Sequence, residues 1–303
     1  MAVTALEIHS RTPFDNGQSF DDVGPYQFLE GKAHFSVNPL HSSNRRIVDL
    51  ELAPRETSGR VRFSADFAML QPLNPQKGNG RILFDVVNRG RKTVLAYNSV
   101  QRAMDPDAPL SAGNGFLMRH GFTVVWCGWQ ADVPPAPQLI GLSAPQALGS
   151  DGKPLTGRIL CQFQCDTPTT LFLLADRQHL PHPPVDVNDP SALLTVRDHP
   201  NAPGQEIPSH RWSFVRVEDE QIEPKPSHVH MPSGFEPGRI YQLVYETTGG
   251  PIVGLGLAAV RDVVSYLKHA PADVGNPCAN SIDYAYAQGI SQSGRFLRTL
   301  IYD

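Results

Sequence analysis

The sequence lacks long hydrophobic runs, because none approaches the roughly 18 apolar residues that a membrane-spanning helix needs. Its first residues, MAVTALEIHSRTPFD, contain neither the basic nor the apolar segment of a secretory signal peptide. Positive charge is not in excess either, since the formal net charge is −4. A nucleic-acid-binding protein would need a basic face. We therefore expect no nucleic-acid partner and no membrane partner, and a cytoplasmic location is favoured.

Cysteine is scarce, with four residues in the chain: Cys127, Cys161, Cys165 and Cys278. Cys161 and Cys165 are four residues apart in a run that resembles a strand, so they share a face but lie about 13 Å apart. A disulfide needs Cα atoms closer than about 7 Å. We expect reduced, structural cysteines.

Proline, in contrast, is abundant: 28 of 303 residues, about twice the usual fraction of ~5%. Because 40% of the residues are apolar, the prolines indicate many turns and loops and not a disordered chain. The length is sufficient to bury a sizeable core.

Four segments follow from the hydrophobic patterns. Residues 1–75 are β-rich and contain no helix-length periodic run, which predicts an antiparallel sheet. Residues 76–130 contain an apolar run at 80–87, a helical stretch at 114–120 and a second apolar run at 122–127. This strand–helix–strand pattern predicts two parallel strands and the first half of an α/β core.

Residues 131–240 contain proline-rich connections between runs that resemble strands, which predicts a β-rich insertion into the α/β core. Two interpretations stay open for this insertion: a cap that shapes a substrate pocket, or a solvated decoration. Residues 241–303 contain the strongest helix signal, at 251–270, and then a short run that leads into the most informative motif of the chain.

This motif is Gly289-Ile290-Ser291-Gln292-Ser293, which lies between a run that resembles a buried strand and a run compatible with a helix. Such a pattern is typical of a nucleophile elbow, in which a serine on a sharp turn holds its hydroxyl clear of the sheet. The residues two before and two after the serine must be small, and Gly289 and Ser293 are. The second small residue is serine where the strict pattern has glycine.

The run AQGISQSGRFLR resembles the elbow of a bacterial family described only as alpha/beta hydrolase domain-containing proteins. NRRIVDLELAPR, VRFSADFAMLQP and RILFDVVNRGRK also resemble segments of that family, so the resemblance covers most of the chain. It implies an α/β fold: a truncated alpha/beta-hydrolase sheet with a β-rich N-terminal region and a β-rich insertion. It also implies a serine hydrolase, an esterase in our interpretation, with no known substrate.

Ser291 is then the expected nucleophile, attacking a small ester-like substrate. One amide for the oxyanion hole is expected from Gln292, the residue after the serine. The second is expected from the loop at 88–90, where either Arg89 or Gly90 would supply it. In this fold the acid and the histidine follow the serine along the chain, but the sequence ends 12 residues after Ser291 (303 − 291). We therefore expect both partners beyond Asp303, a chain that is nearly inactive alone, and self-association through an exposed sheet edge.

Other motifs are weaker. Gly254-x-Gly256-x-x-Ala259 matches the residue pattern of a dinucleotide fingerprint, but Thr247-Thr248-Gly249-Gly250-Pro251 lies between it and the preceding strand, so close helix packing explains it better. Residues 289–296 lack the lysine and the hydroxyl of a phosphate-binding loop. His228 and His230 lie between prolines, which indicates a solvated loop and not a metal pair. We expect no metal and no cofactor. The alternative function is a non-catalytic scaffold or binding protein with a fold like that of the hydrolases.

Overall fold

The structure is a computed structural model that describes residues 2–100, 110–177, 179–218 and 221–302. It divides into two compact units. Unit 1 comprises Met1–Pro145 and Pro251–Asp303, and unit 2 comprises Gln146–Gly250. Unit 2 overlaps the predicted insertion at 131–240, but the segment from 131 to 145 belongs to unit 1.

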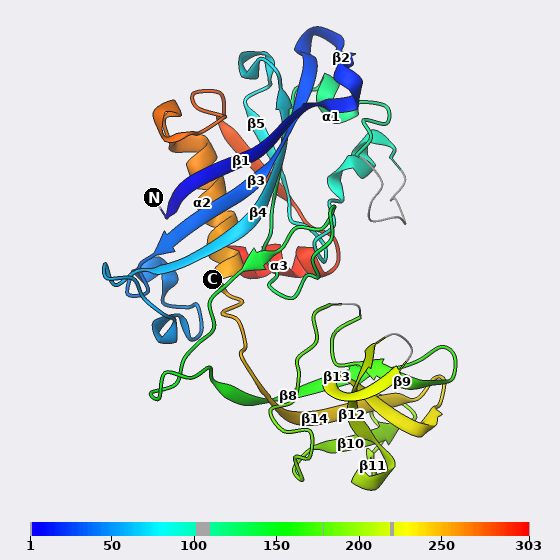
Figure 1. Ribbon diagram of the computed structural model, residues 1–303. Helices are drawn as coiled ribbons and strands as arrows, with labels where there is room; N and C mark the ends of the chain where they lie inside the picture. Colours follow the sequence, from blue (N-terminus) through cyan, green and yellow to red (C-terminus); the bar gives the residue numbers. More distant parts are fainter. Residues whose placement is uncertain (1, 101–109, 178, 219–220, 303) are drawn as a thin grey trace. The chain divides into compact units, whose positions relative to one another are not determined.

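Unit 1 contains one large sheet and three α-helices (Figure 1). The strands are β1 (Val3–Pro13), β2 (Ser19–Phe20), β3 (Gly24–Val37), β4 (Val61–Pro72), β5 (Arg81–Asp85), β6 (Thr123–Cys127), β7 (Leu142–Ser143) and β15 (Tyr284–Gln288). The α-helices are α1 (Phe116–Arg119), α2 (Leu255–His269) and α3 (Gln292–Tyr302). Short 3₁₀ helices occupy the connections: η1 (Phe14–Gly17), η2 (Asp21–Val23), η3 (Ser42–Asn44), η4 (Leu50–Leu52), η5 (Pro75–Lys77), η6 (Val94–Asn98) and η8 (Ala272–Val274).

The order of strands in this sheet is β1-β3-β4-β6-β5-β15. β1, β3 and β4 pair antiparallel, and β4 also pairs antiparallel with β6. β5 pairs parallel with both β6 and β15, so the strand–helix–strand prediction for β5, α1 and β6 is confirmed. α2 lies across one face of the sheet (Figure 1) and contacts β1 and β6. A hydrophobic cluster that includes Leu70 and Trp126 also contains buried residues of η6 and α1, such as Val94 and Leu117.

The regular secondary structure of the described part of unit 2 consists of strands and one 3₁₀ helix, η7 (Ser209–Arg211). The strands are β8 (Thr156–Phe163), β9 (Thr169–Leu173), β10 (Leu193–Arg197), β11 (Gln205–Ile207), β12 (Ser213–Glu218), β13 (Gln221–Phe235) and β14 (Ile240–Thr248). They form a four-stranded sheet, β11-β10-β14-β8, and a three-stranded sheet, β12-β13-β9. Tyr241, Leu243 and Tyr245 alternate along β14 and are buried, as side chains on the inner face of a sheet are. In the same core, Phe163 stacks on Tyr241, and Phe235 packs edge-to-face against it.

The predicted α/β fold class, with a truncated alpha/beta-hydrolase sheet, is wrong. Strands make up 38% of the chain and form three sheets, whereas helices make up 20%, and the described residues contain three α-helices. Antiparallel neighbours need no crossover helix, so most of the strands add sheet without adding helix. The α/β fold class was inferred mainly from the helix at 251–270 and the elbow motif, which together make up a small part of the chain. The protein is a β-rich fold.

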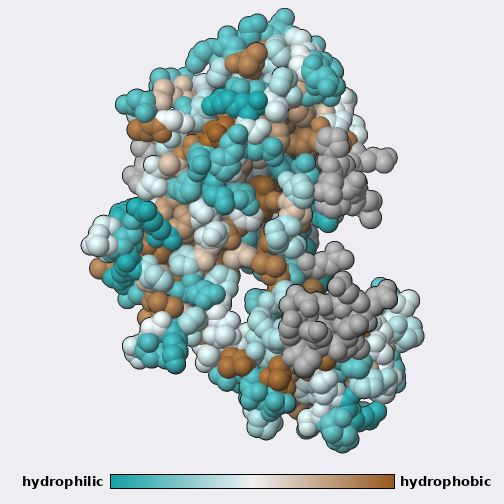
Figure 2. Space-filling model, in the orientation of Figure 1, coloured by the Kyte–Doolittle hydropathy of each residue, from teal (hydrophilic) through white to brown (hydrophobic). Residues whose placement is uncertain are grey.

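The face in Figure 2 is mainly hydrophilic, and hydrophobic side chains are scattered over it. Within the described ranges, no helix combines the length and the apolar character that crossing a membrane would demand. All four cysteines are buried and free.

We predict that unit 2 folds on its own, because its hydrophobic cluster is built from its own residues. A chain of residues 146–250 should unfold in one cooperative transition. Trp212, which is 9% exposed, should report this transition by fluorescence, since the other two tryptophans lie in unit 1. Leu243→Asp places a charge in this core and should abolish the transition. A broad, non-cooperative melt of the unsubstituted segment would contradict independent folding.

Candidate functional site

A sharp turn joins the end of β15 to the start of α3. The strand ends at Gln288, the helix begins at Gln292, and Ser291 between them has φ of +56°. A positive φ at a non-glycine residue costs about 1–3 kcal/mol and persists only where the surroundings impose it. Ser291 is solvent-exposed. The expected strand–turn–helix arrangement is present at the predicted serine.

The two small residues of the motif make this turn possible. A Cβ atom on Gly289 would lie 2.4 Å from the carbonyl oxygen of Ser293, so only glycine fits there. Ser293 is fully buried, and its hydroxyl accepts a hydrogen bond from the Ile290 amide (2.9 Å) and donates one to the Ile290 carbonyl (3.1 Å). Serine at the second small position therefore closes the turn with its own side chain, which glycine could not do.

One part of the expectation is wrong: the strand that leads to Ser291 is not buried. β15 lies at the end of the sheet order among the described strands, and Tyr284 and Tyr286 are 61% and 50% exposed. Association of two chains through this edge stays a prediction.

The loop at 88–90 contacts the turn directly. The Asn88 side-chain amide donates a hydrogen bond to the Ile290 carbonyl (2.7 Å), and the Val86 amide donates one to the Gln288 carbonyl (2.9 Å). Parallel pairing of β5 with β15 explains this, because both strands end at the same edge of the sheet. The structure thus brings the predicted oxyanion loop and the predicted nucleophile together.

The loop itself is a tight two-residue turn. Asn88 and Arg91 exchange backbone hydrogen bonds of 3.0 and 3.1 Å, and Arg89 and Gly90 between them have φ of +53° and +77°. Two central residues with positive φ are typical of type I′ turns. A Cβ atom on Gly90 would lie 2.7 Å from Cγ1 of Val133, so glycine is also required here by space.

The structure distinguishes between the two predicted donors of this loop. The Arg89 amide already donates to Oε1 of Gln130 (3.1 Å). Within the described part of the chain, no group accepts a hydrogen bond from the Gly90 amide. The Gln292 amide opens α3, where the first amides of a helix have no acceptor within the helix. The amides of Gly90 and Gln292 are therefore the better candidates for binding an anion.

A buried carboxylate, which the sequence analysis did not assign a role, holds the loop in place. Asp85 is fully buried at the end of β5 and accepts hydrogen bonds from the Thr93 amide (2.5 Å) and hydroxyl (2.8 Å), the Val94 amide (2.8 Å) and the Trp126 indole (2.7 Å). Burial raises the pKa of Asp85, although these four donors oppose the shift. A single charged residue inside an apolar strand run, just before a loop, is the sequence signal that could have identified it.

Tryptophan and glutamine side chains complete the surroundings of the turn. The Trp129 indole donates to the Val87 carbonyl (2.7 Å), and its ring lies 4.6 Å from that of Phe296 on α3. In the described residues, the side-chain oxygens of Gln288 and Gln292 are buried and accept no hydrogen bond. Both oxygens are thus exceptions to the rule that buried polar atoms are hydrogen-bonded.

The other predicted features have structural positions as well. A Cβ atom on Gly256 would lie 2.2 Å from the Trp129 carbonyl oxygen, so the glycine pattern at the start of α2 serves close packing. His228 and His230 lie in strand β13 and not in a loop, so that interpretation is wrong. No set of three or more histidine, cysteine, aspartate or glutamate side chains in the described residues could hold a metal ion. Nor does any described histidine form a hydrogen bond with Ser291.

Comparisons with protein-family models, with curated proteins and with solved structures find no match for this chain. They therefore give no support to the family resemblance.

We predict that Gly289→Ala destabilises the protein, because the added methyl group would overlap the Ser293 carbonyl. The free energy of unfolding in urea should fall by more than about 1 kcal/mol. Gly250→Ala is a matched control, since nothing lies within 4 Å of a Cβ atom at that position. Equal stability of the two variants would contradict the tight turn.

We also predict that Asp85→Asn lowers the free energy of unfolding by about 1–3 kcal/mol, because an amide nitrogen would face hydrogen-bond donors. The loss should depend on pH. A carboxyl whose folded pKa is raised contributes most stability below its unfolded pKa of about 3.9, and less as pH rises through the folded value. The difference between the native protein and the variant should therefore be larger at pH 4 than at pH 7. A difference that grows with pH would contradict the assignment.

Proposed function

We propose that the protein is a serine hydrolase of the carboxylic ester type, with Ser291 as its nucleophile. The observation that carries this proposal is the positive φ of Ser291 on an exposed turn between β15 and α3. A strained backbone at a solvent-accessible serine is a common way to present a nucleophile, and the close approach of Gly289 to Ser293 is the spacing that such a turn requires.

The reaction would be acyl transfer. The Ser291 oxygen attacks the carbonyl carbon of an ester, and a base takes the hydroxyl proton. The tetrahedral intermediate then collapses, the bond to the alcohol oxygen breaks, and the alcohol leaves with that proton. Water attacks the acyl-serine in the same way, which releases the acid and restores Ser291.

The amides of Gln292 and Gly90 are the proposed oxyanion donors. Pre-oriented amides stabilise the negative charge that develops on the carbonyl oxygen, and removal of one donor from such a site costs about 10²–10³ in rate. The Arg89 amide is a poorer candidate for the oxyanion donor because it already donates a hydrogen bond to the Gln130 side chain. The proposal assigns no base, since no described histidine forms a hydrogen bond with Ser291.

We predict that a fluorophosphonate probe labels Ser291. The protein tested is the complete product of its gene. Mass spectrometry should locate the adduct on the peptide that contains residue 291, and Ser291→Ala should remove the label completely. Ser58→Ala, which changes an exposed serine in a turn, should leave labelling unchanged. No labelling of the unsubstituted protein would favour the non-catalytic scaffold, and labelling that survives in Ser291→Ala would place the nucleophile elsewhere.

A further inference from the structure

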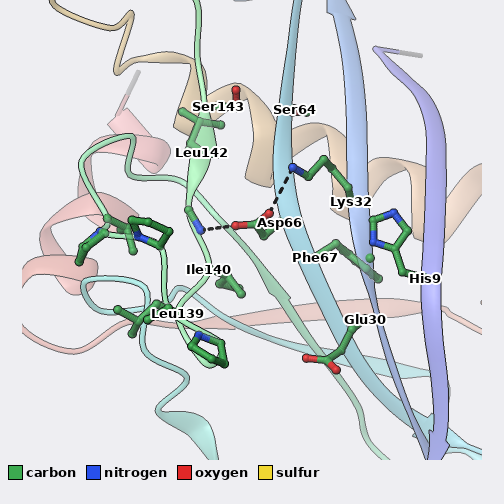
Figure 3. A pocket seen from close by; sticks show the side chains of 17 residues that line it. His9, Glu30, Lys32, Ser64, Asp66, Phe67, Leu139, Ile140, Leu142 and Ser143 are labelled. Carbon is green, nitrogen blue, oxygen red and sulfur yellow. Dashed lines mark hydrogen bonds and ion pairs between the residues drawn. The ribbon is translucent and has the colours of Figure 1, made fainter. Parts of the chain in front are cut away.

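Unit 1 contains a cavity that the proposed reaction does not use. It has a volume of about 450 Å³ and lies between the sheet of β1, β3 and β4 and the segment 133–143, which we call the strap (Figure 3). Small-molecule sites usually have volumes of about 300–1,000 Å³, so this cavity is large enough for a ligand. The cavity differs from the turn at Ser291, because none of its lining residues belongs to β15 or α3.

The wall that the sheet provides is charged. Glu30 and Lys32 are two residues apart on β3 and so point to the same face, and Asp66 on β4 lies directly opposite Lys32. Figure 3 shows these three side chains on the cavity side of the sheet, with His9 of β1 beside them. The lining therefore contains two carboxylates and one ammonium group.

Only one of the two carboxylates is neutralised within the protein. Asp66 accepts a hydrogen bond from the Gly141 amide (2.9 Å) and forms an ion pair with Lys32 (3.6 Å). Glu30 is half-buried, but it forms no hydrogen bond and no ion pair with any described residue. Glu30 is thus the lining carboxylate that makes no direct contact with a basic side chain of the described residues.

Two basic side chains of this region, Lys92 and His9, do not contact the Glu30 carboxylate. The attraction of Glu30 for Lys92 nevertheless opposes the lowering of the Lys92 pKa by burial. The Lys92 ammonium lies 3.4 Å from the Gln138 carbonyl oxygen and 6.0 Å from the centroids of the Phe28 and Trp126 rings. It does not line the cavity. His9 forms an ion pair with Glu7 (3.2 Å), which lies outside the lining.

The opposite wall is uncharged and rigid. Every lining residue from the strap is apolar or neutral, and three of them, Pro134, Pro135 and Pro137, are prolines. Proline has a fixed φ, so such a wall loses little conformational freedom when a ligand packs against it. The Asp66 bond to Gly141 holds the end of the strap against β4.

From this arrangement we propose that the cavity binds a small molecule with a cationic ammonium head and an apolar body. The ammonium group pairs with the Glu30 carboxylate, and the apolar body lies along the prolines of the strap. This site does not depend on the hydrolase proposal, because it uses neither Ser291 nor the loop at 88–90.

Isothermal titration calorimetry with three probes of the same shape tests the site: 4-phenylbutylammonium, 4-phenylbutanol and 4-phenylbutanoate. We expect the ammonium compound to bind with one equivalent, and the alcohol and the acid to bind at least about 10-fold more weakly, because a hydrogen bond to a charged group is the strong kind. Glu30→Gln should reduce the affinity for the ammonium probe about 10-fold and remove the preference among the probes. Glu51→Gln, an exposed carboxylate outside the cavity, should change nothing.

A variant that fills the cavity locates the binding site. Ala136→Trp places a large side chain in the strap and should abolish binding, while the far-ultraviolet circular dichroism spectrum shows that the variant is folded. The proposal is overturned if the ammonium probe does not bind the unsubstituted protein at millimolar concentration. Equal binding of all three probes, or binding that survives in Ala136→Trp or is unchanged in Glu30→Gln, also overturns it.

Discussion

The hydrogen bond from the Asn88 side chain to the Ile290 carbonyl joins two segments that are 202 residues apart in the chain. It exists because β5 and β15 are parallel neighbours, so the loop after one strand meets the turn after the other. The strained backbone at Ser291 needs such support from outside its own segment. The position of the turn depends on this pairing, since a shift of one residue between the two strands would separate Asn88 from Ile290.

Two aspartates organise the loops of unit 1 in similar ways. Asp85 accepts hydrogen bonds from two backbone amides of the segment that follows the loop at 88–90. Asp66 accepts a hydrogen bond from the Gly141 amide of the strap. In both cases a carboxylate on a strand supplies acceptors to irregular backbone, which would otherwise leave donors unsatisfied. The strap and the loop also touch, because the Ile140 amide donates to the Gly90 carbonyl (3.0 Å). The sheet therefore fixes both irregular segments through a few polar side chains.

Local patterns predicted individual elements well and their assembly poorly. The apolar run at 80–87 became β5, and the helix predicted at 251–270 became α2. The 15-residue strand β13 was missed because prolines interrupt it, although the structure accommodates Pro232 in an irregular part of the pairing with β9. Assembly depended on contacts that no local pattern reveals. The Arg89 amide donates a hydrogen bond to the Gln130 side chain. The segment 131–145, which the sequence analysis assigned to the insertion, belongs to unit 1 and is bound there by Asp66.

The position of unit 2 within the chain has a consequence for the order of folding. The Ile252 amide donates to the Pro145 carbonyl (3.0 Å), so the two points at which the chain leaves and re-enters unit 1 are adjacent. While unit 2 is unfolded, pairing of β15 with β5 closes a loop that contains all the residues of unit 2. The entropic cost of closing such a loop grows with its length. Once unit 2 has folded, that long flexible loop is replaced by a compact body on two short connections. Early folding of unit 2 thus lowers the entropic barrier to forming the turn at Ser291, the last part of the site to be synthesised.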